Sequence, residues 1–171
     1  MTGWFELFFI LQVLGAVVGV FGATSAELVA LRAIAKGKAS GGRTRYLKAF
    51  SLTLRVALPL FFLGMFGSMF FGYQEPSLAS FVFTPEFWVA QTLIIVLLID
   101  AQVIRRRGWE WIGSTVSLVS WYAILALLLG FIEESYFETV LGFLIAMAGV
   151  DGVLRWLRAF LQGPLPRALS S

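Results

Sequence analysis

Four ionisable residues lie inside apolar segments of the chain, where a charged group has little water to solvate it. They are Glu27, Arg55, Asp100 and Asp151. Each stands within seven residues of a basic residue near the end of its segment. At about 1.5 Å rise per helical residue, all four fall within roughly 10 Å of one membrane interface. Because an intramembrane charge is costly, we treat this polar layer as the first candidate for a functional site.

Two kinds of chemistry are open for the polar layer. In a structural layer, Arg55 pairs with Glu27 or Asp100. Asp151 then pairs with Arg155, which follows it by one helical turn. In a binding layer, the excess of acids over bases favours a bound cation or a retained proton. Oxygen ligands alone would suit Mg²⁺, Ca²⁺ or Mn²⁺. A third alternative is that the four side chains never meet.

The chain contains no Cys and no His, which removes most other chemistry. Disulfides, thiolate nucleophiles, Cys/His zinc sites and His-ligated haem are excluded, and so is the usual general base. No nucleophile–base pair, phosphate-binding loop or metalloprotease helix is present. We therefore expect no enzymatic activity, no metal and no cofactor. Binding of a pigment through Gln12, an acid or a water stays open.

The segments around these residues predict an all-α, polytopic membrane helix bundle. The composition is 59% hydrophobic and 13% charged, with a mean hydropathy of +0.87, far more apolar than a soluble domain. A spanning helix needs about 20 mainly apolar residues. Five segments meet that length, at about 4–30, 49–73, 87–104, 112–132 and 137–161. Together they form a single transmembrane domain over residues 1–171.

The basic residues predict the orientation of the five spans. Twelve of the 13 Lys and Arg residues fall on one side of the membrane that the spans define, and six Glu residues fall on the other. The positive-inside rule then places the N-terminus outside and the C-terminus in the cytoplasm. We expect the membrane to be the cytoplasmic membrane of a bacterium; the same topology would also fit an organelle. Arg105, Arg106 and Arg107 form a topogenic cluster that also suits anionic lipid headgroups. The pI of 9.6 thus indicates lipid rather than nucleic acid.

Small residues repeat at helical spacing and predict close helix packing. The first span carries Gln12, Gly15, Gly19 and Ala23 on one face, and the last span carries Gly142, Ala146 and Gly149. Small side chains let membrane helices approach closely, so we interpret these faces as packing seams. They could meet inside the bundle or dock another subunit. In the first span, a binding groove with Gln12 and Glu27 at its polar ends is the alternative.

The stretch Leu11–Gly22, LQVLGAVVGVFG, resembles the first helix of small bacterial membrane proteins related to copper resistance protein D. In those proteins a His usually stands where this chain has Gln12. Members of that group are implicated in copper handling or bind haem through His. Because this chain has no His, the resemblance implies a fold and not that chemistry.

Two functions follow as expectations. The first is a non-catalytic accessory or structural subunit of a larger membrane assembly, which predicts apolar helix faces left uncovered and no internal cavity. The alternative is a small cation- or proton-coupled transporter or channel, which predicts a water-accessible cavity reaching the polar layer. The expected partners are membrane lipids and either other membrane subunits or further copies of the chain.

Overall fold

The computed structural model describes residues 2–36, 39–74, 84–107, 110–131 and 135–162. Side chains are described for 3–36, 51, 54–74, 84–100, 114–131 and 135–161. Every regular element in these ranges is an α-helix. The helices are α1 (Thr2–Ala35), α2 (Ala39–Gln74), α4 (Pro85–Arg107), α5 (Glu110–Leu128) and α6 (Tyr136–Gln162). The predicted all-α class is confirmed, and four of the five predicted segments lie wholly within helices. The fourth, 112–132, was predicted too long, because α5 ends at Leu128.

Three of the described helices are long and apolar enough to cross a membrane. These stretches are Gly3–Ala35 in α1, Leu54–Gln74 in α2 and Tyr136–Leu161 in α6. A shorter apolar stretch, Ser114–Leu128, lies in α5. Helices suit apolar surroundings because all their backbone hydrogen bonds close within one segment.

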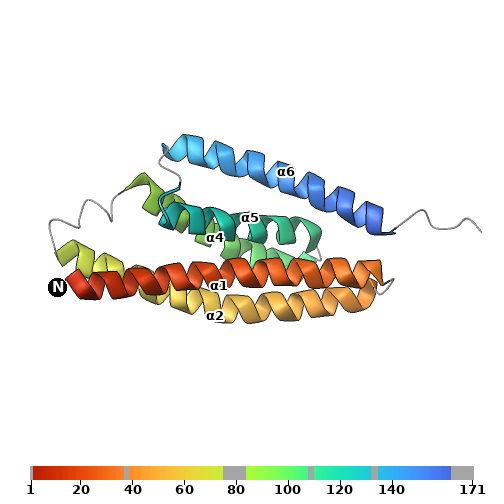
Figure 1. Cartoon of the computed structure of the whole chain (residues 1–171), viewed down its shortest axis with the longest axis horizontal. Helices are drawn as coiled ribbons and strands as arrows, with labels where there is room; N and C mark the ends of the chain where they lie inside the picture. Colours follow the sequence, from red (N-terminus) through yellow and green to blue (C-terminus); the bar gives the residue numbers. More distant parts are fainter. Residues whose placement is uncertain (1, 37–38, 75–83, 108–109, 132–134, 163–171) are drawn as a thin grey trace, which may run out of the picture.

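The helices pack as two antiparallel pairs with α6 along one side (Figure 1). α1 pairs with α2, and α4 pairs with α5. α1 and α5 also contact each other, and both contact α6. The ends of α1, α4 and α6 lie together at one end of the bundle, which we call the basic end because Arg32 and Lys36 lie there. The opposite, acidic end carries Glu6, Glu86 and Glu138.

The connection from α5 to α6 has strong local signals at both helix ends. Gly130 adopts a positive φ of 71°, and Phe131 N–H donates to Ala126 O at 3.0 Å, which is the pattern of a Schellman motif. α6 begins with a capping box. Ser135 N–H and Oγ–H donate to Glu138 Oε2 at 3.1 and 2.7 Å, and Glu138 N–H donates back to Ser135 Oγ at 3.4 Å.

Glycines set the distance between α1 and its neighbours. A Cβ at Gly15 would meet the backbone of Phe61, and one at Gly64 would meet the backbone of Gln12. α1 and α2 therefore touch backbone to backbone. A Cβ at Gly19 would overlap the ring of Trp121, which is fully buried. The indole thus occupies the space that Gly19 leaves between α1 and α5.

The predicted seam on α6 packs against nothing at two of its three positions. A Cβ at Gly142 or Gly149 would meet no atom within 4 Å, and both residues are exposed, as is Ala146. This differs from the seam on α1, where Gly15 and Gly19 are buried. The reason is that α6 makes its contacts through other residues, so its small-residue face is left uncovered within this chain.

Candidate functional site

The residues of the predicted polar layer differ in burial. Glu27 is 5% exposed and Asp100 is 9% exposed. Asp151 is half-buried, whereas Arg55 is exposed on α2. Among the described residues, no ion pair joins Arg55 to Glu27 or Asp100. The prediction that Arg55 pairs with Glu27 or Asp100 is therefore wrong. A different arginine forms the ion pair with Glu27.

Arg158 is the partner of Glu27. Its Nη2 donates to Glu27 Oε1 at 2.6 Å and to Ser114 Oγ at 2.8 Å. The two side chains of the ion pair are 17% and 6% exposed. This cluster, which we call the polar clasp, joins α1, α5 and α6. A charge-assisted hydrogen bond in such surroundings is stronger than one in water.

The register of α1 against α5 brings the polar clasp together. Gly19 lies under Trp121, and eight residues further along α1 comes Glu27. Ser114 precedes Trp121 by seven residues on the antiparallel α5. These separations are roughly 12 and 10 Å at the rise of an α-helix, so Glu27 and Ser114 reach the same level. Packing of the indole on Gly19 thus aligns the polar groups near the basic end.

Asp151 makes a local pair instead of joining the polar clasp. Arg155 Nε donates to Asp151 Oδ2 at 2.7 Å, one turn along α6. The side chain of Arg155 is 57% exposed, so water screens this pair. The local alternative predicted for these two residues is the one found.

Asp100 lies at the same level as Ser117 on the neighbouring helix. Asp100 precedes the end of α4 by seven residues, and Ser117 follows the start of α5 by seven. Asp100 Oδ2 and Ser117 Oγ are buried without a hydrogen-bond partner among the described residues, and so is Glu27 Oε2. Two carboxylate oxygens and a hydroxyl are thus left to accept a proton or bind a small polar ligand.

The remaining sequence candidates fall in two groups. On α1, Gln12 and Ala23 are buried, and Ser68 Oγ donates to Gln12 Oε1 at 3.5 Å across the pair with α2. The side chains of Arg105, Arg106 and Arg107 lie outside the described residues. Among the described residues, no group of three or more His, Cys, Asp or Glu could hold a metal ion.

Sequence reasoning did not assign Arg158 to the site. Arg158 stands close to the predicted end of the last span at 161, where a basic residue is expected to orient the chain. The excess of acids over bases in the polar layer was a usable signal that one more cation was needed. Nothing local in the sequence, however, indicates that residue 158 faces residue 27.

Comparison with known proteins identifies no relative of this chain. The chain matches no protein-family model, no curated protein and no solved structure.

Proposed function

We propose that the chain is an integral protein of a bacterial cytoplasmic membrane that crosses it five times, with the N-terminus outside and the basic end in the cytoplasm. Three helices of spanning length and the separation of basic from acidic ends support this placement. The resemblance to the copper resistance protein D group is consistent with a multi-pass membrane fold, and it stays a prediction.

Within the membrane, we propose that the chain is a non-catalytic accessory subunit that docks another membrane protein through α6. The observation that supports this role is the open surface of α6 at Gly149, which lies outside the space that Gly142 and Ala146 share with α5. Only 11% of the apolar stretch of α6 is buried inside the chain, compared with 28% for α1 and for α2. Glycine weakens a helix and offers lipid no side chain, so exposed glycines on a membrane helix favour close contact with a second helix.

The polar clasp fits this role as an attachment point. Glu27 and Arg158 hold α6 to the bundle near its C-terminal end, and the open position Gly149 lies closer to the middle of the helix. A helix anchored at one end keeps its face oriented while leaving that face free for a partner.

The test is native mass spectrometry of the protein extracted from its own membrane in mild detergent. We expect a second membrane protein to be released with it in a fixed ratio, and Gly149→Leu to abolish that complex. Ala148→Leu is the control, since Ala148 is also exposed but lies about 100° or more around the helix from Gly142, Ala146 and Gly149. Release of the wild-type chain alone would overturn the proposed docking role.

A second candidate is a proton or cation pathway, favoured by the unpartnered oxygens of Glu27 and Asp100. Glu27 and Asp100 are both buried, and of these two only Glu27 has an arginine partner among the described residues, so Asp100 is the carboxylate that favours a further positive charge. Uptake into proteoliposomes tests this alternative. Flux that is unchanged by Glu27→Gln and by Asp100→Asn would exclude the carboxylates as a transport site.

A further inference from the structure

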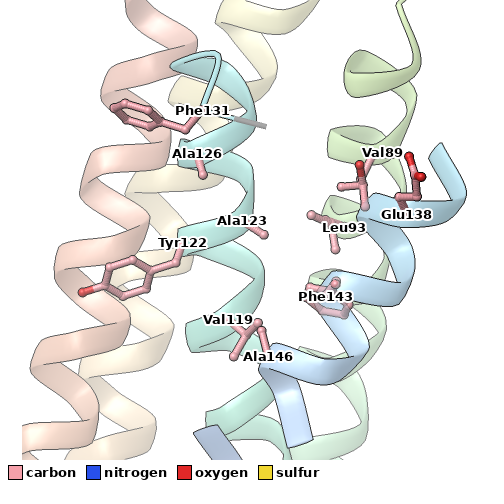
Figure 2. Close-up of a pocket in the computed structure, with 12 residues that line it drawn as sticks. Val89, Leu93, Val119, Tyr122, Ala123, Ala126, Phe131, Glu138, Phe143 and Ala146 are labelled. Carbon is pink, nitrogen blue, oxygen red and sulfur yellow. The ribbon is translucent and has the colours of Figure 1, made fainter. Parts of the chain in front are cut away.

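A groove of about 370 Å³ opens between α4, α5 and α6 toward the acidic end (Figure 2). Ala123 and Ala126 of α5 form one side, and Gly142 and Ala146 of α6 form the other. Val89 and Leu93 reach it from α4. The groove exists because small residues on both helices face a space that neither helix closes. Its volume lies within the usual range for small-ligand sites.

Apart from Tyr122, whose hydroxyl forms a hydrogen bond with Thr24 Oγ1 at 3.2 Å, the lining of the groove is apolar except near one end. Glu138 and Thr139 in the first turn of α6 are the polar groups there. Thr139 Oγ donates to Ser135 O at 3.0 Å, so its hydroxyl hydrogen is used. Both contacts from Ser135 to the Glu138 carboxylate go to Oε2. Neither contact uses Oε1, and Glu138 is exposed, so this oxygen can accept a hydrogen bond from another donor.

The lining of the groove indicates what can occupy it. The residues from Ala126 to Ala146 form an apolar row between α5 and α6, which suits a hydrocarbon chain lying along it. In a bilayer, such chains are the solvent that surrounds the groove.

We propose that this groove binds one acyl chain of an aminophospholipid, with the headgroup ammonium at Glu138. The carboxylate complements a cationic donor and disfavours an anionic headgroup such as that of phosphatidylglycerol. This inference uses the membrane placement of the proposed function, but not the docking of a second subunit through α6.

The experiment reconstitutes the whole chain in nanodiscs of equal parts phosphatidylethanolamine and phosphatidylglycerol, followed by native mass spectrometry. We expect wild type to retain one phosphatidylethanolamine. Ala123→Leu and Gly142→Leu fill the groove from opposite sides, and each should lower retention about tenfold. Gly152→Leu, which adds the same side chain outside the groove, should retain the lipid. Equal retention by all variants would overturn the proposal.

The headgroup contact has its own variant. Glu138→Gln keeps the capping box, because glutamine also serves at that position of the motif. It should leave an acyl chain bound while removing the preference for phosphatidylethanolamine over phosphatidylglycerol. Unchanged preference would overturn the role of Glu138.

The outcome is separable from that of the proposed docking role. A chain released alone from its membrane but still carrying phosphatidylethanolamine would defeat the docking role and support the groove. If wild type carries no lipid but a foreign subunit stays bound to the Ala123→Leu variant, the docking role is supported and the lipid site in the groove is overturned.

Discussion

Arg158 donates to Glu27 at 2.6 Å although 131 residues separate them in the chain. The contact ties the last helix to the first and leaves neither charge solvated, since the two side chains are 17% and 6% exposed. It is the interaction that most directly determines where the C-terminal part of α6 lies.

Replacing Arg158 should therefore destabilise the protein strongly. Arg158→Gln leaves the Glu27 carboxylate buried without its cation, which costs about 3–5 kcal/mol in comparable pairs and corresponds to a Tm lower by about 10 °C. Thermal unfolding in detergent, followed by circular dichroism, measures this. Arg155→Gln is the control, because its pair is exposed and local. Glu27→Gln combined with Arg158→Gln should recover part of the loss. Equal Tm values for the two arginine variants would contradict the role of the polar clasp.

The contact between Gly19 and Trp121 should tolerate no side chain. Gly19→Ala places a methyl group in the indole ring, which is fully buried and has no free space to enter, so we expect a loss of about 1–3 kcal/mol. Gly142→Ala meets nothing within 4 Å and should gain about 0.5–1 kcal/mol from better helix propensity. Chemical denaturation of both variants gives the comparison. Trp121→Leu in the Gly19→Ala background should restore stability in part, and its failure to do so would place the clash elsewhere.

Two glycines at the α1–α2 contact should differ in their sensitivity. A methyl group at Gly15 meets the backbone of Phe61, so the helices themselves must separate. A methyl group at Gly67 meets the ring of Phe8, which is half-buried and can rotate. We expect Gly15→Ala to be less stable than Gly67→Ala by about 1 kcal/mol or more, as measured by midpoints of thermal unfolding in one detergent. The reverse order would argue against the backbone contact.

The proposed orientation is testable because the chain has no native cysteine. In intact cells, a membrane-impermeant maleimide should label Glu6→Cys at the acidic end without further treatment. Lys36→Cys at the basic end should react only after the membrane is permeabilised. Both positions are exposed, so accessibility and not burial decides the result. The opposite labelling pattern would invert the topology.

Much of the secondary structure could be predicted from local pattern. Apolar runs of spanning length predicted each helix, and the Ser135-to-Glu138 spacing is a recognisable capping box at the start of α6. The small residues of α1 were predicted to form a packing face, and Gly15 and Gly19 lie against their neighbours. The same pattern on α6 was ambiguous, because a small-residue face looks alike whether a helix of the same chain or another molecule covers it.

The candidate site was only partly predictable. Glu27 and Asp100 stood out because a charge in an apolar segment is expensive wherever the segment packs. The partner of Glu27 could not be recognised in the same way, since Arg55 and Arg158 are both basic residues near the same end of the bundle. Which of them reaches Glu27 depends on the rotation of α2 and α6 about their axes.

Local sequence is enough to predict the helices, the separation of basic from acidic ends and the high cost of a charge at Glu27 and Asp100, because these depend on short-range periodicity and on the free energy of desolvation. Only the tertiary structure decided that Arg158 pairs with Glu27, that Trp121 lies on Gly19 and that Gly142 faces an open groove. Such contacts depend on the register and rotation of whole helices. Those are settled by the sum of many weak packing interactions and not by any single local pattern.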